Sequence, residues 1–215
     1  MDVKTKNWIM GGLIFLSLVL ALIFWSKMPE RMITHWNASG EPDGWGPKWM
    51  GLLLMPLVLL FIYLLYWLVP KIDPLRKNLM KFYDYYVNLM LVLMTFMFYV
   101  YVITILINLG YEFSMNFVLF PAMAALFYYI GIIMEKAKRN WFIGIRTPWT
   151  LSSDRVWEKT HKRGGKLFKV IAVLFLFGAF DGDSVWIILA PVLVMAAYLV
   201  VYSYFEYAKE EKKQK

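Results

Sequence analysis

Six long apolar blocks constrain the fold of this chain more than any other feature. A helix needs about 20 predominantly apolar residues to cross the roughly 30 Å hydrocarbon layer of a bilayer. The blocks that reach or approach this length are residues 8–26, 49–69, 85–107, 116–134, 167–180 and 184–205. The first block ends without a small-residue cleavage pattern, so we expect it to remain as a span. The sequence therefore predicts an all-α, polytopic membrane protein with six transmembrane helices.

The basic residues are distributed unevenly between the two sides that six spans would create. Of the 23 Lys and Arg residues, all but three fall on the side that holds both termini. The exceptions are Lys27, Arg31 and Lys48. Because Lys and Arg favour the cytoplasmic side of a membrane, we expect both termini to be cytoplasmic. The loop at residues 27–48 and the turns at 108–114 and 181–184 should then face outward.

The spans group into three predicted hairpins within one integral membrane domain. The first hairpin covers residues 1–70 and includes an extracellular cap loop at 27–48. The middle hairpin covers residues 71–134. Residues 135–215 hold a cytoplasmic loop at 135–166, followed by the last hairpin.

The polar residues argue against several classes of function. The middle of each apolar block has no Asp, Glu, Lys, Arg or His, and such residues mark the ion pathways of coupled transporters. The chain has no Cys, which excludes disulfides, thiolate metal sites and a cysteine nucleophile. We therefore predict neither a cofactor nor a metal, and no enzymatic activity.

The outer loop has the composition of an ordered cap. Gly40 and Gly44 suit positive φ angles, and the Pro-Asp-Gly run ending at Gly44 is typical of a tight turn. His35 and the acidic residues near it either bind a metal or hydrogen-bond the loop, and one His with two acids favours the second interpretation. Aromatic and imidazole side chains suit an amphipathic ligand. The candidate ligand-binding residues are Met32, His35, Trp36, Asn37, Asp43 and Trp45.

The inner loop is predicted to form an amphipathic helix at the membrane surface. Arg146 to Trp149 should be extended or turned, because Pro148 disfavours helix at the residue before it. Ser152, Ser153 or Asp154 can cap a helix that starts near Arg155. The pair Gly164-Gly165 should end that helix before the fifth span. The loop is strongly basic, so it should attract anionic lipids.

Two motifs give this chain a resemblance to a known family. The inner loop carries N-x-x-x-G-I-R-T-P-W-T-L, starting at Asn140, and then V-W-x-x-T-H-x-x-G-G, starting at Val156. Both resemble the signature of the SdpI family of bacterial membrane immunity proteins. The outer loop is similar to a domain of unknown function that often precedes this signature. The matching outer residues are Pro29, His35, Trp36, Asn37, Gly40, Pro42, Asp43 and Lys48.

The resemblance implies a location, a function and partners. Members of the family sit in the bacterial cytoplasmic membrane and protect the cell against a secreted antimicrobial peptide toxin. The named member also holds a helix-turn-helix repressor at the membrane, so we expect the outer loop to meet the toxin and the inner loop the repressor, without direct nucleic-acid binding. The candidate inner residues are Asn140, Gly144, Arg146, Thr147, Pro148, Trp149, Thr150, Trp157, His161 and Arg163.

Two other interpretations of the residues stay open. In one, the chain is a transporter or enzyme that acts on a lipid or small molecule, with Arg146 and His161 gripping a phosphate headgroup. In the other, the inner loop is purely structural and Arg146 caps helix C-termini through their carbonyls. The absence of a nucleophile motif weighs against the enzyme interpretation.

Overall fold

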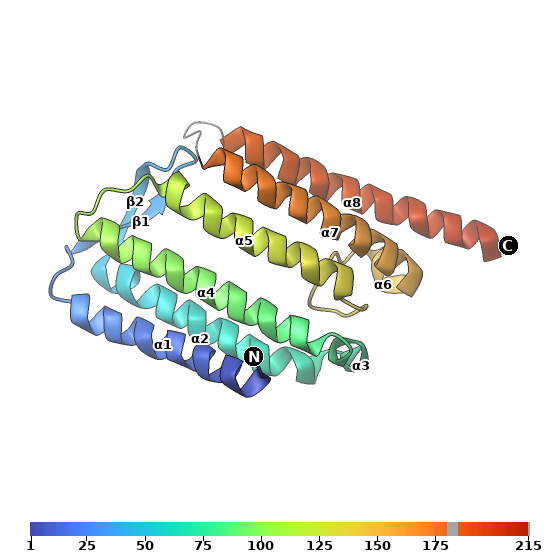
Figure 1. Ribbon diagram of the computed structural model, residues 1–215, viewed down its shortest axis with the longest axis horizontal. Helices are drawn as coiled ribbons and strands as arrows, with labels where there is room; N and C mark the ends of the chain where they lie inside the picture. The colour runs from blue at the N-terminus through green and yellow to red at the C-terminus, as the bar shows by residue number, and fades with distance from the viewer. Residues whose placement is uncertain (180–184, 215) are drawn as a thin grey trace.

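In the computed structural model, which describes residues 1–179 and 185–214, long helices lie side by side (Figure 1). The long helices are α1 (Val3–Phe24), α2 (Lys48–Ile72), α4 (Tyr83–Asn108), α5 (Met115–Lys136), α7 (Asp154–Gly178) and α8 (Val185–Gln214). Two short helices, α3 (Arg76–Met80) and α6 (Pro148–Ser152), lie in the connections. The strands β1 (Arg31–Trp36) and β2 (Pro42–Pro47) form a hairpin between α1 and α2.

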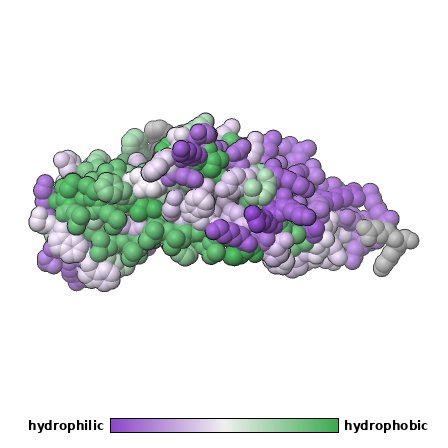
Figure 2. Space-filling model, turned by 90° about the horizontal axis from the view of Figure 1, so that it is seen from below, coloured by the Kyte–Doolittle hydropathy of each residue, from purple (hydrophilic) through white to green (hydrophobic). Residues whose placement is uncertain are grey.

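Five of these helices are long and apolar enough to cross a membrane. They are α1, α2, α4, α5 and the part of α8 from Ile188–Lys213. Apolar residues cover a broad part of the bundle, and polar residues gather toward the end that carries the C-terminus (Figure 2). The predicted fifth span, 167–180, forms the C-terminal half of α7 as far as Gly178. Basic residues occupy the N-terminal half of this helix. The count of six spans therefore stays a prediction.

The two ends of the bundle carry different structures. The hairpin and the connection between α4 and α5 lie at one end, whereas α3, α6 and the C-terminus lie at the other, as does the start of α1 (Figure 1). The charge distribution predicts that the hairpin end faces outward, and this orientation stays a prediction. We call the hairpin end the outer end and the opposite end the inner end. The turn predicted at 181–184 lies outside the described residues.

The structure is mostly helical, which is consistent with the all-α prediction, and the outer loop adds one two-stranded antiparallel sheet. Arg31 pairs with Pro47 and Ile33 pairs with Trp45. Gly40 has φ +81 in the turn, a conformation that glycine adopts readily. An isolated two-stranded hairpin is at best marginally stable in water, so this one depends on contacts with the helices.

Two amide side chains attach the hairpin to the helices. Asn108, at the end of α4, accepts a hydrogen bond from the Ile33 N–H at 2.7 Å and donates one to the Ile33 carbonyl at 3.0 Å. Asn116, at the start of α5, donates to the Ala38 carbonyl at 3.3 Å. The hairpin is therefore fixed to the outer ends of α4 and α5.

The prediction that Gly164-Gly165 ends a helix is wrong. Helix α7 continues through both residues to Gly178. The glycines permit close packing instead: a Cβ at Gly165 would lie 2.7 Å from the Gly131 carbonyl oxygen on α5. A Cβ at Gly131 would lie 2.8 Å from the Gly165 carbonyl oxygen. The two backbones thus touch, and the predicted surface helix and fifth span are one continuous helix.

The Gly131→Ala substitution should force α5 and α7 apart. We expect the free energy of unfolding to fall by about 1–3 kcal/mol, because overpacking a close contact costs this much. Gly11→Ala in α1 is the matched control, since a Cβ there meets nothing within 4 Å. Thermal unfolding in detergent, followed by circular dichroism, measures both. Equal unfolding midpoints in the two variants would contradict the backbone contact.

Candidate functional site

A groove opens at the outer end between the hairpin and the connection from α4 to α5. Its volume is about 440 Å³. Trp36 lines it from β1, and Tyr111 and Phe113 line it from the connection. The rings of Tyr111 and Phe113 are stacked with their centres 6.3 Å apart, and both side chains are exposed. This outer groove therefore offers aromatic surface to a ligand at the edge of the bundle.

Of the six predicted outer residues, Trp36 alone is among the residues that line this groove. His35 and Asp43 pair with each other at 2.5 Å on the exposed side of the hairpin. Trp45 is 51% exposed on β2. Tyr111 and Phe113 were missed by the sequence reasoning, although two aromatics in a predicted outward turn are a usable signal of an exposed aromatic surface.

Asn37 and Met32 hold the hairpin together and against the bundle. The Asn37 side-chain oxygen accepts hydrogen bonds from the Ser39 and Glu41 N–H groups, at 2.9 and 3.0 Å. Met32 is fully buried among core residues that include Leu52 and Tyr101. Within the described residues, no cluster of three or more His, Asp or Glu side chains is placed to hold a metal.

At the inner end, Asn140 shapes the loop between α5 and α6. Its side chain is fully buried. The amide oxygen accepts from the Phe142 and Ile143 N–H groups, at 2.9 and 2.7 Å. The amide nitrogen donates to the Lys138 and Ile143 carbonyls, both at 2.9 Å. One side chain thus satisfies four polar groups of a tight turn, which explains why the motif begins with Asn.

His161 joins this loop to α7. Its Nε2 accepts a hydrogen bond from the Ile145 N–H at 2.9 Å, so the proton must sit on Nδ1, which donates to the Trp157 carbonyl at 2.8 Å. The imidazole is buried and stacks on the Trp157 ring with 3.9 Å between centres. Burial lowers the pKa of His161 to about 4, although the bond to the Trp157 carbonyl opposes this. The ring is therefore neutral and both its nitrogens are engaged.

Gly144 and Trp157 complete the contact around His161. Gly144 has φ +123, and a Cβ there would lie 2.3 Å from His161 Nε2. The Trp157 indole N–H donates to the Ala137 carbonyl at 2.9 Å, and the indole is buried. The loop can therefore lie against the imidazole because residue 144 is a glycine and has no side chain.

The segment from Thr147 to Thr150 attaches the loop to α8. Thr147 and Thr150 form a reciprocal capping box at the start of α6, with Pro148 in its first turn. The Thr150 hydroxyl donates to the Ile145 carbonyl at 2.7 Å, and the Thr147 hydroxyl lies 3.0 Å from that of Ser203. Trp149 packs against Tyr204 with ring centres 5.2 Å apart. As predicted, Thr147 is extended before the proline. Pro148 and Trp149 are instead helical, because they begin α6, which was not predicted.

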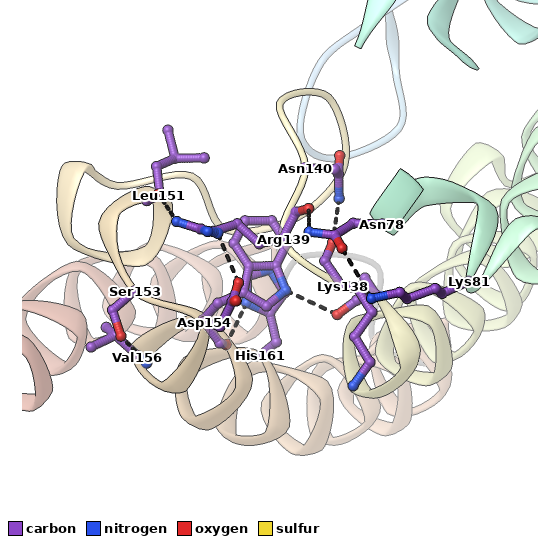
Figure 3. A network of polar contacts seen from close by, with 12 residues as sticks. Asn78, Lys81, Lys138, Arg139, Asn140, Leu151, Ser153, Asp154, Val156 and His161 are labelled. Carbon is purple, nitrogen blue, oxygen red and sulfur yellow. Dashed lines mark hydrogen bonds and ion pairs between the residues drawn. The ribbon is translucent and has the colours of Figure 1, made fainter. Parts of the chain in front are cut away.

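Three charged residues hydrogen-bond backbone groups in and beside the inner loop. Arg146 donates to the Trp141 carbonyl at 2.6 Å, which is a loop carbonyl and not a helix end. Arg139 donates to the Leu151 carbonyl at 2.8 Å, and its Nε lies 2.8 Å from the Asp154 carboxylate (Figure 3). The buried Asp73 carboxylate accepts from the Trp141 N–H at 3.2 Å. Arg139 was missed because a loop of many cations does not reveal which of them is bonded. Asp73 was missed because its partner, the Trp141 N–H, lies 68 residues away in the sequence.

A cavity of about 560 Å³ lies beside this network. Trp157 and His161 reach it from α7, and Asn78 reaches it from α3. Basic residues outnumber acidic ones around it. The charged lining residues are Lys81, Lys136, Lys138, Arg139, Lys162, Lys166, Glu135, Asp154 and Glu158. This inner cavity suits a ligand or partner surface that carries negative charge.

The neutral His161 predicts a defined pH dependence of stability. Its pKa is lower in the folded protein than the ordinary 6.5, so the unfolded chain binds a proton more readily. Stability is then fully present above pH 6.5 and falls by on the order of 3 kcal/mol as the pH drops toward 4. The difference in unfolding free energy between wild type and His161→Gln should narrow over this window. A wild-type pH profile that His161→Gln leaves unchanged would assign the titration elsewhere.

The close approach of Gly144 to His161 gives a second prediction. Gly144→Ala should destabilise the protein by about 3 kcal/mol or more, since backbone strain and a steric clash add. Gly110→Ala is the control, because Gly110 also has a positive φ, +96, but a Cβ there meets nothing within 4 Å. It should cost on the order of 1–2 kcal/mol. Chemical unfolding of the detergent-solubilised variants compares them, and equal losses would remove the clash from the explanation.

Comparison with known proteins finds a match for each of the two segments that hold the motifs. Residues 136–203 match the SdpI/YfhL protein family, and residues 12–60 match a domain of unknown function, DUF1648. The chain is 24% identical over 206 residues to Immunity protein SdpI of Bacillus subtilis (strain 168), a match that covers 95% of this chain and 97% of the relative. No solved structure matches the chain.

These matches confirm the resemblance, because the outer and inner motifs fall within the two matched segments. The five long apolar helices and the full-length relative together identify a multi-pass protein of the cytoplasmic membrane. The chain is thus similar along nearly its whole length to Immunity protein SdpI, matches DUF1648 at residues 12–60, and matches the SdpI/YfhL protein family at residues 136–203.

Proposed function

We propose that this chain is a membrane immunity protein that protects its cell against a secreted antimicrobial peptide. The observation that carries the proposal is the match to Immunity protein SdpI, which extends over 95% of the chain. A match of this extent includes the outer hairpin, the helices and the inner loop, so it concerns the whole architecture. An immunity protein in the membrane must meet its toxin at or near the outer surface.

The outer groove is the proposed contact for the toxin. Trp36, Tyr111 and Phe113 supply rings that are apolar with polar edges, which suits an amphipathic peptide at a membrane surface. Asn108 and Asn116 hold the hairpin in place, so Trp36 is presented by a fixed support. The exposed His35–Asp43 pair lies on the same hairpin and would provide polar contacts.

The inner cavity is the proposed contact for a cytoplasmic partner, such as a helix-turn-helix repressor with an acidic surface. Lys138 and Lys162 line this cavity and are exposed, while Arg146 lies on the exposed side of the adjoining loop. Trp157 and His161 are buried and would act by holding the loop in shape. Helix α5 connects the two ends, since Asn116 touches the hairpin and Gly131 touches α7.

The enzyme or transporter alternative has less support. His161 is its candidate acid or base, and both ring nitrogens of His161 are bonded to backbone groups. A catalytic histidine needs one nitrogen that reaches the substrate. Arg146, the candidate phosphate ligand, is bonded to the Trp141 carbonyl. We therefore retain immunity as the function.

Survival of a sensitive bacterium tests the proposal. Cells that express the wild type should tolerate the killing peptide against which the SdpI family protects. Trp36→Ala should lower the tolerated concentration by about tenfold, because an aromatic anchor contributes one or more factors of ten to binding. Trp49→Ala is the control, since Trp49 is exposed near the same end but does not line the groove.

Membrane levels of each variant, measured by immunoblot, separate lost binding from lost protein. Wild-type survival of Trp36→Ala cells at equal levels would remove the groove from toxin recognition. A well-expressed wild type that gives no protection at all would contradict the immunity function for this peptide.

A further inference from the structure

One exposed face of α7 changes from basic to apolar along the helix. Residues spaced alternately by four and three positions lie on a single helical face. Such a stripe runs through Lys159, Arg163, Lys166, Val170, Val173 and Phe177. The three apolar members, Val170, Val173 and Phe177, are 56%, 48% and 68% exposed. We call this series the α7 stripe.

The basic half of the α7 stripe borders a small cavity between α7 and α8. The cavity has a volume of about 240 Å³ and is lined by Lys159, Lys162, Arg163, Lys166 and Tyr202. The Arg163 guanidinium lies 5.5 Å from the centre of the Tyr202 ring. We call it the basic pocket. Its lining consists of cationic side chains and one phenol, which together are donors for an anion.

Neighbouring carboxylates neutralise only part of the positive charge of the basic pocket. Lys159 is ion-paired with Glu206, which also pairs with Lys209. In the part of the chain that the structure describes, Lys162, Arg163 and Lys166 have no ion-pair partner. These side chains are exposed and stand close together on one turn of helix. An anion bound there would relieve their mutual repulsion.

We propose that the basic pocket and the α7 stripe form a binding site for one anionic phospholipid. The phosphate would lie against Arg163 and Lys166. The acyl chains would lie along Val170, Val173 and Phe177. The rise of a helix is 1.5 Å per residue, so Lys166 and Val170 are about 6 Å apart along the axis, which suits the step from a headgroup phosphate into the hydrocarbon.

The two halves of the site together select the occupant. A zwitterionic phospholipid has no net charge to offset the three unpaired cations. A free phosphate has no chains to cover the exposed valines and phenylalanine, so burial of apolar surface would add nothing to its binding. An anionic phospholipid satisfies both requirements. This inference does not depend on the immunity function, because it concerns the membrane and not the toxin.

Lipid binding to the purified full-length protein tests the site. Detergent-solubilised protein is titrated with phosphatidylglycerol, phosphatidylcholine or inorganic phosphate, and bound ligand is counted by native mass spectrometry. We expect phosphatidylglycerol to bind one per chain and more tightly than the other two. In the double variant Arg163→Gln/Lys166→Gln its affinity should fall by about 30-fold, since each basic residue near an anionic surface contributes on the order of fivefold.

The control removes the same charge elsewhere. Lys212→Gln/Lys213→Gln changes two exposed lysines at the end of α8 that do not line the basic pocket, and it should bind like the wild type. Equal losses in both double variants would indicate non-specific attraction and overturn the site. Inorganic phosphate or phosphatidylcholine binding as tightly as phosphatidylglycerol would also overturn it. If Arg163→Gln/Lys166→Gln fails to fold, Lys166→Gln alone should show a loss of about fivefold.

Discussion

The contact between the backbones of α5 and α7 is the constraint on which the inner half of the structure depends. Gly131 and Gly165 bring the two helices together without a side chain between them. The inner loop leaves α5 at Lys136 and reaches α7 at Asp154, so this contact fixes the separation of its two ends. Only at this separation can His161 meet the Ile145 N–H while Trp157 reaches the Ala137 carbonyl. The motif residues therefore act as one folded unit.

Much of the helical architecture could be predicted from hydrophobic length alone. The errors arose where tertiary contacts override a local signal. The pair Gly164-Gly165 reads as a helix end in isolation, but the approach of α5 makes glycine necessary within a helix. The hairpin is similar, since its strands depend on Asn108 and Asn116, which lie far away in the sequence. The short helices α3 and α6 are too brief to give a periodic signal.

The structure shows contacts of the inner motif residues that the sequence did not predict. Asn140 bonds the Ile143 N–H, His161 bonds the Ile145 N–H, and Gly144 lies against the His161 ring. That these residues also meet a partner stays a prediction. A sequence motif does not distinguish residues that touch a partner from residues that hold the shape of a loop. Tyr111 and Phe113 illustrate the reverse case, because the groove they line exists only once the hairpin is folded.

The hydrogen bonds of Asn108 also protect the hairpin from aggregation. An isolated hairpin outside a membrane presents open strand edges, which other chains can extend by pairing with them. Asn108 occupies both polar groups of Ile33 on β1, as a neighbouring strand would. On β2, Pro42 and Pro47 have no N–H to offer. The hairpin thus displays its side chains while Asn108 and the two prolines reduce the number of backbone groups that another strand could pair with.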